Sequence, residues 1–189
     1  MSKKIAVFLA EGFEEGESVF VIDILRRAGF QCDSVSIKEE MVKGTNGIEV
    51  KADKIVSDDI KEYDMIVLPG GQPGATNLRD NEQVVELVKY FDKTPKKLIA
   101  AICAAPIVLE KAGIIKGRKM TSYPSEKYTE LFKEANYEED IVVIDDRLIT
   151  SRGPAATLPF AYALVDVLGG DSGALKERML YNLVRESNY

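Results

Sequence analysis

Histidine is absent from this chain of 189 residues, and only two residues are cysteine, Cys32 and Cys103. Without histidine, the Cys-His pairs of ordinary thiol proteases are excluded, so a nucleophilic cysteine needs a carboxylate, the backbone or the substrate as its partner. Two cysteines in a domain of this size do not make a disulfide framework. We therefore expect two free thiols.

Excess positive charge and long hydrophobic runs are also missing. The 25 Lys and Arg residues are outnumbered by 31 Asp and Glu residues, and the net charge of -6 opposes binding to a phosphate backbone. The longest nearly continuous apolar stretch, 98–109, contains Pro106 and is shorter than the roughly 20 residues of a membrane-spanning helix. The apolar run 5–10 is too short, and too soon followed by acidic residues, for a signal peptide. We expect a cytoplasmic protein that binds neither nucleic acid nor membrane.

Apolar strand-like runs alternate with helical patterns along the chain. Strands are predicted at 5–9, 30–37, 65–68 and 97–102, and a hairpin joins 141–144 to 148–150. Helices are predicted at 18–28, 81–91, 106–112, 125–135, 156–168 and 172–184, and short strands and turns at 39–54. This alternation predicts one α/β domain, 1–189, built as a three-layer sandwich around a mostly parallel sheet. Ligands of such folds bind beyond the carboxyl ends of the strands, here 11–17, 69–74 and 103–106.

Cys103 stands where a predicted strand meets a predicted helix start at Pro106. Free backbone N–H groups and the helix dipole at such a turn can lower a thiol pKa and give a reactive thiolate. The alternative is a small buried apolar residue, because free cysteines are common in protein cores. Cys32 lies in a predicted strand with no helix start beside it, so we expect it to be inert.

Four motifs together resemble one family. They are 14–17 (Glu-Glu-Gly-Glu), 68–71 (Leu-Pro-Gly-Gly), 100–106 (Ala-Ala-Ile-Cys-Ala-Ala-Pro) and 150–154 (Thr-Ser-Arg-Gly-Pro). Their order and spacing resemble the ThiJ/PfpI superfamily, and within it the DJ-one-like branch. The resemblance implies a flavodoxin-like, class I glutamine amidotransferase-like fold, a homodimer, and no cofactor or metal.

The resemblance also implies roles for a cysteine and a carboxylate. Cys103 matches the family's oxidisable nucleophile, which is held in a strained turn called the nucleophile elbow. Glu17 matches the carboxylate that hydrogen-bonds this cysteine. A carboxyl group buried beside a thiolate is disfavoured as an anion, so we expect Glu17 to be protonated. The alternative for Glu17 is an exposed charge in the first turn of a helix, the role that we expect for Glu11, Glu14 and Glu15.

Three backbone N–H groups complete the implied site. Gly70, Gly71 and Ala104 match positions whose N–H groups face the cysteine, where they could hold an oxyanion or a sulfinate oxygen. A tight turn is the simpler explanation for the glycine pair, and both can hold, because glycine also lets the backbone approach a ligand closely.

Three further residues match the family's pocket and dimer positions. Arg152 and Pro154 match a loop that closes the pocket, although a plain turn after a hairpin explains them equally. Arg27 matches an arginine at the dimer interface, and the alternative is an exposed helix arginine.

The chain departs from the family pattern beside the nucleophile. Many members have histidine before the proline at 124, where this chain has Tyr123, and a tyrosine with a pKa near 10 is a poor base at neutral pH. Protease-like members have histidine directly after the cysteine, where this chain has Ala104. We therefore expect no peptidase activity.

Two main functional hypotheses follow from the resemblance. The first is a cofactor-free glyoxalase or deglycase acting on small reactive carbonyls such as methylglyoxal, with attack by Cys103, proton transfer by Glu17 and substrate orientation by Tyr123. The second is a redox-responsive protein in which Cys103 is oxidised to a sulfinate, with a chaperone role also implied. A third, esterase activity, would need a water-activating base that the sequence does not obviously supply.

Overall fold

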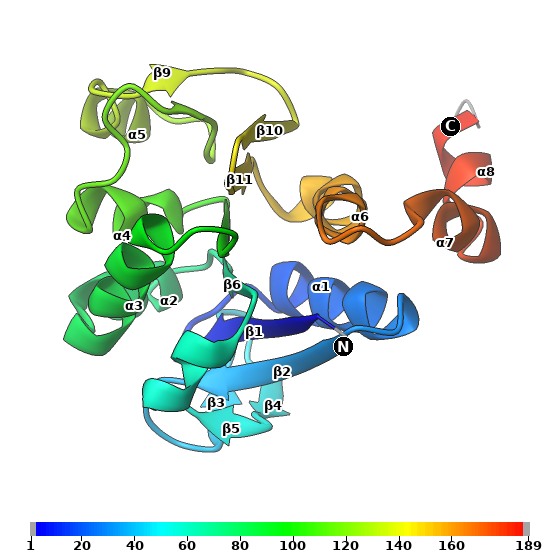
Figure 1. The fold of residues 1–189 in the computed structure, drawn as a ribbon, viewed down its shortest axis with the longest axis horizontal. Helices are drawn as coiled ribbons and strands as arrows, with labels where there is room; N and C mark the ends of the chain where they lie inside the picture. Colours follow the sequence, from blue (N-terminus) through cyan, green and yellow to red (C-terminus); the bar gives the residue numbers. More distant parts are fainter. Residues whose placement is uncertain (1–2, 187–189) are drawn as a thin grey trace.

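The computed structural model describes residues 3–186, in which seven strands form a central sheet (Figure 1). In order across the sheet they are β10 (Val142–Asp145), β11 (Leu148–Ser151), β7 (Leu98–Ile102), β6 (Met65–Leu68), β1 (Lys4–Leu9), β2 (Gln31–Ser36) and β5 (Lys54–Ile55). Only β10, at one edge, runs antiparallel to its neighbour. The flavodoxin-like α/β fold is thereby confirmed. Residues 1–2 and 187–189, which the predicted domain 1–189 includes, lie outside the described part.

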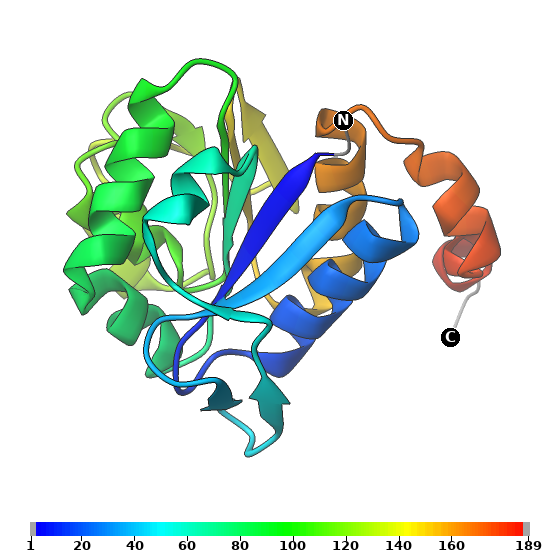
Figure 2. The same ribbon diagram turned by 60° about the horizontal axis from the view of Figure 1, so that its bottom comes forward.

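Helices cover both faces of this sheet (Figure 2). One face carries α1 (Glu15–Arg27) and α6 (Thr157–Val167), which pack together; the other carries α2 (Gly74–Asp80), α3 (Glu82–Lys93) and α4 (Pro106–Lys111). Beyond α6 lie α7 (Ser172–Arg178) and α8 (Tyr181–Glu186). The other described elements are α5 (Glu126–Leu131), the 3₁₀ helices η1 (Asp58–Glu62) and η2 (Pro154–Ala156), and two small sheets, β3 (Met41–Lys43) with β4 (Glu49–Lys51) and β8 (Lys119–Met120) with β9 (Asn136–Tyr137).

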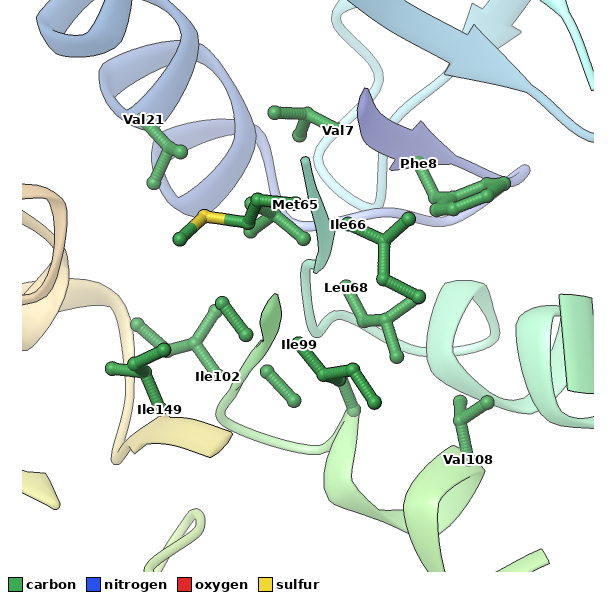
Figure 3. Close-up of a cluster of buried hydrophobic side chains, with 14 of the residues drawn as sticks. Val7, Phe8, Val21, Met65, Ile66, Leu68, Ile99, Ile102, Val108 and Ile149 are labelled. Carbon is green, nitrogen blue, oxygen red and sulfur yellow. The ribbon is translucent and has the colours of Figure 1, made fainter. Parts of the chain in front are cut away.

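The core lies on both faces of the central strands (Figure 3). Met65 lies on the side of Val21 from α1, whereas Ile66 and Ile99 lie on the side of Val108 from α4. All five side chains are buried. Because parallel strands covered on both faces bury every side chain, they appear in the sequence as continuous apolar runs and not as alternating patterns.

Most predicted elements are present, and the differences have physical causes. Residues 141–144 and 148–150 form the predicted hairpin, as β10 and β11. The single helix predicted over 172–184 is wrong: Leu180 adopts a φ of +58° between α7 and α8, and a left-handed residue cannot continue a right-handed helix. The helix predicted over 125–135 is shorter, and α2 was not predicted because its glycine and asparagine favour helices weakly.

No helix among residues 3–186 has the length and apolar character needed to cross a membrane.

Candidate active site

Three loops meet at one end of the sheet, as the sequence predicted. β1, β6 and β7 are neighbours and run parallel, so their carboxyl ends lie side by side. The Glu14 N–H donates to the Gly70 carbonyl at 3.0 Å and thereby links the first two loops. The Gly70 N–H donates to Glu17 Oε2 at 2.8 Å, and Glu17 in turn contacts Cys103 in the third loop.

Cys103 occupies a strained turn between β7 and α4. Its φ is +62°, a left-handed conformation that is uncommon for residues other than glycine. The turn is held from two sides: the Cys103 N–H donates to the Ser151 carbonyl at 3.0 Å, and the Cys103 carbonyl accepts from the Tyr123 N–H at 2.9 Å. The side chain is 9% exposed, so it is nearly buried and still faces a pocket. This geometry agrees with the predicted nucleophile elbow.

Glu17 is completely buried in the first turn of α1. The Glu14 carboxylate caps the helix by accepting the Glu17 N–H at 2.6 Å, which fixes the start of the helix. Glu17 Oε2 accepts from Gly70, whereas Oε1 is buried without a conventional hydrogen-bond partner among the described residues. The alternative of an exposed charge is therefore wrong for Glu17.

Burial raises the pKa of the Glu17 carboxyl to about 7, against the lowering effects of the Gly70 N–H and the Cys103 contact. Protonated Glu17 can therefore donate its O–H to the sulfur and still accept the Gly70 hydrogen bond.

Burial also raises the pKa of the Cys103 thiol, and the nearby Glu17 carboxylate raises it further, while the N–H groups of Ala104 and Gly71 lower it. The expectation that the helix start lowers this thiol pKa is thus not fulfilled, because burial outweighs it. Once Glu17 takes a proton, its charge no longer opposes the thiolate and its O–H becomes a donor to sulfur. Protonation of Glu17 therefore favours the Cys103 thiolate, and ionisation of Glu17 opposes it.

The two glycines have different roles. The Gly70 N–H, expected to face the cysteine, instead positions Glu17, and a Cβ at Gly70 would stand 2.7 Å from both Cys103 Cβ and Glu17 Oε2. Gly71 has a φ of +87° and its N–H faces the sulfur together with that of Ala104. Gly71 and Ala104 are thus the N–H pair available to an oxyanion.

The sulfur faces a mostly apolar pocket of about 410 Å³. Tyr123, 47% exposed, forms part of its wall. Gln72, which lies in the predicted loop 69–74, also lines the pocket. Ser125, Lys127 and Tyr128 line it too and were not predicted, because nothing in the local sequence pattern places 125–128 beside Cys103. The full lining is Gly71, Gln72, Cys103, Ala104, Tyr123, Ser125, Lys127 and Tyr128.

Arg152, Pro154 and Arg27 are not among the residues that line this pocket. Arg152 lines a neighbouring hollow and donates to the Glu139 carbonyl at 2.7 Å, and Pro154 is exposed at the start of η2. Arg27 pairs with Asp23 at 2.7 Å on the exposed side of α1, and its role in a dimer stays a prediction.

Cys32 lies as the sequence predicted, whereas Glu15 does not. Cys32 is 3% exposed in β2 and burial raises its pKa to about 12, as expected for an inert thiol. Glu15, expected to be an exposed helix charge, is instead buried and accepts from the Asn46 N–H at 2.7 Å and from Asn46 Nδ2 at 2.9 Å. It therefore holds the β3–β4 turn against α1.

The sequence model of the DJ-1/PfpI family matches residues 3–167. The chain belongs to this family. It is 38% identical over 176 residues to the protein dj-1beta of Drosophila melanogaster, covering 90% of this chain and 91% of the relative. The crystal structure of Drosophila melanogaster DJ-1beta superposes with a TM-score of 0.89 at 36% identity, covering 95% of this chain and 98% of that one.

Two further members of the DJ-1/PfpI family are informative. An oxidised DJ-1 from Toxoplasma gondii superposes with a TM-score of 0.86 at 34% identity, covering 95% of this chain and 98% of that one. The DJ-1 homolog B of Arabidopsis thaliana is 37% identical over 93% of this chain, which spans only 40% of that longer protein. The family thus uses this unit both as nearly a whole chain and as part of a longer one.

Proposed function

We propose that this DJ-1/PfpI protein is a cofactor-free, cysteine-dependent enzyme of the glyoxalase or deglycase type, acting on reactive dicarbonyls such as methylglyoxal. The observation that carries the proposal is the buried Glu17 carboxyl, which contacts Cys103 and has a pKa raised to about 7. A group that titrates near neutral pH can both give and take a proton during one reaction.

The first step is attack by the Cys103 thiolate on the aldehyde carbon of methylglyoxal. A sulfur–carbon bond forms, and the carbonyl π electrons move to the oxygen, which the Gly71 and Ala104 N–H groups that face the sulfur can stabilise. Glu17 donates its proton to this oxygen and becomes a carboxylate. The product is a neutral hemithioacetal.

Glu17 then acts as the base. Its carboxylate removes the proton from the former aldehyde carbon, a carbon–carbon double bond forms, and the ketone oxygen becomes the oxyanion of an enediolate. Glu17 returns this proton to the neighbouring carbon while the hydroxyl proton moves to the enolate oxygen, which gives a lactoyl thioester. Water cleaves the sulfur–carbon bond, so that methylglyoxal and water become lactate and the thiol returns. Tyr123 can orient the substrate but is a poor base, so we expect turnover to be slow for this family.

The test is lactate formation from methylglyoxal without glutathione. We expect turnover by the wild type and its loss in Cys103→Ala and Glu17→Gln, with Cys32→Ala as the matched control because Cys32 is buried away from the pocket. No lactate from the wild type, or full activity in Glu17→Gln, would refute the proposal.

A redox-responsive role is the second candidate. The DJ-1 from Toxoplasma gondii is described as oxidised, and the same N–H pair with protonated Glu17 could hold sulfinate oxygens on Cys103. The thiolate reduces one peroxide to give a sulfenic acid and a second to give the sulfinic acid, with water as the other product. Mass spectrometry after mild peroxide treatment should find two added oxygens on Cys103 and none on Cys32, and equal oxidation of both would exclude this role. A chaperone role stays a prediction.

Homodimer formation and a cytoplasmic location complete the proposal. On α1, Val19 and Phe20 are 46% and 48% exposed, the same helix ends at the half-exposed Arg27, and a surface with exposed apolar side chains and an arginine suits a subunit contact. Both cysteines are free thiols, in keeping with a reducing compartment. Light scattering should give twice the monomer mass for the wild type and a smaller mass for Phe20→Ser.

A further inference from the structure

Lys127 is the one charged residue among those that line the Cys103 pocket. The other lining groups are two tyrosines, a glutamine, a serine, the thiol and small residues. Tyr128 lies beneath the lysine, with its ring centroid 6.0 Å from Lys127 Nζ. The lysine is exposed at the pocket, so its ammonium group can meet a ligand that reaches Cys103.

The charge of Lys127 is not neutralised by an ion pair within the described part of the chain. Its helical neighbour three residues ahead, Glu130, is instead paired with Lys133 at 2.8 Å. The carboxylates of Glu126 and Glu130 line the adjoining hollow and not this pocket. In a protein with a net charge of -6, the pocket that Cys103 lines thus contains one cationic side chain, Lys127.

We propose that Lys127 makes this pocket select carbonyl compounds that carry a carboxylate. The substrate class is 2-oxoaldehydes with an anionic tail, whose aldehyde carbon meets Cys103 while the carboxylate pairs with the lysine. This inference rests on the proposed function for its substrate class, but the anion selectivity itself concerns the pocket alone.

The selectivity can be measured without turnover by alkylating Cys103. Iodoacetate and iodoacetamide react identically: a sulfur–carbon bond forms, the carbon–iodine bond breaks, and iodide leaves with the electron pair. They differ in that one carries a carboxylate and the other a neutral amide. The ratio of their rate constants therefore reports the charge of the pocket, and dividing the two rates cancels changes in thiol pKa.

We expect Lys127→Met to lower the iodoacetate-to-iodoacetamide ratio by up to about fivefold, the range of a partly exposed ion pair. Lys127→Arg should retain the wild-type ratio because it keeps the charge. Lys116→Met is the matched control, since Lys116 is exposed in a different hollow, and should change nothing. An unchanged ratio in Lys127→Met, or an equal fall in Lys116→Met, would overturn the proposal.

Turnover then separates the two proposals. The carboxylate-bearing 4,5-dioxopentanoate and the neutral 2-oxopentanal share the dicarbonyl group and chain length. The wild type should favour the anionic substrate in kcat/KM, and Lys127→Met should lose this preference through KM with little change for the neutral one. If neither is converted while the alkylation ratio still falls in Lys127→Met, the enzyme proposal fails and the anion selectivity stands.

Discussion

The Glu17 carboxyl should make the stability of the protein fall as pH rises through neutrality. Its pKa is raised from 4.5 to about 7 by complete burial. The folded state therefore keeps a proton that the unfolded chain loses, so the stabilisation is complete below pH 4.5 and is lost as pH rises through 7. With about 1.4 kcal/mol per pKa unit, the free energy of unfolding of the wild type should fall by about 2–3 kcal/mol between pH 5 and pH 8 because of this group.

Urea unfolding of the wild type and Glu17→Gln at the two pH values measures this loss. Glutamine keeps an acceptor for the Gly70 N–H and places an N–H donor toward the sulfur, but it does not titrate. The difference in the free energy of unfolding between pH 5 and pH 8 should therefore shrink by about 2–3 kcal/mol in the variant. Repeating the comparison of Glu17 with Glu17→Gln in a Cys103→Ala background removes the contribution of the titrating thiol. Equal pH dependence with and without Glu17 would refute a raised carboxyl pKa.

Three further substitutions test the site and its support. Tyr123→His should raise lactate formation by at least about tenfold, because it supplies a base near neutral pH; an unchanged rate would show that proton transfer does not limit turnover. Gly70→Ala should lower the free energy of unfolding, measured in urea, by about 1–3 kcal/mol, since the added methyl group would lie 2.7 Å from Cys103 Cβ. Glu15→Gln should lower the free energy of unfolding by about 1–2 kcal/mol at pH 7. The loss should be smaller at low pH, because hydrogen bonds from Asn46 lower the Glu15 pKa despite burial, and the carboxylate that they stabilise is protonated there. If Glu15→Gln lowers the free energy of unfolding equally at pH 7 and at low pH, the prediction for Glu15 is wrong.

The sequence predicts which loops form the site, because the parallel strands that precede these loops can be recognised in the sequence. Apolar runs such as 65–68 and 97–102, alternating with helical patterns, indicate buried parallel strands, and parallel neighbours bring their carboxyl ends to one edge. Cys103 and Glu17 each follow such a strand, so their meeting needs only the strand order. What the topology does not determine is whether burial or the helix start governs the thiol pKa, since that depends on the depth of the side chain.

Residues that reach the site from elsewhere in the fold could not be predicted. Lys127 lies on α5, beyond a strand that is only two residues long, and a sequence pattern gives no position for such a helix relative to the sheet. Glu14 and Glu15 are adjacent in sequence and chemically identical, yet Glu14 caps a helix and Glu15 holds the β3–β4 turn. Neighbouring residues on a helix face different directions, so their partners are fixed only by packing.

The protonation state of Glu17 also distinguishes the two candidate functions, because they place opposite demands on this carboxyl group. Lactate formation requires Glu17 to lose its proton to the substrate oxygen and then to accept one from carbon in every cycle. A sulfinate on Cys103 requires Glu17 to keep its proton as a donor. Glutamine can donate an N–H but cannot give up a proton at neutral pH. Glu17→Gln should therefore abolish lactate formation and still permit peroxide to oxidise Cys103 to the sulfinate; loss of both would show that the carboxyl group is needed to form the thiolate itself.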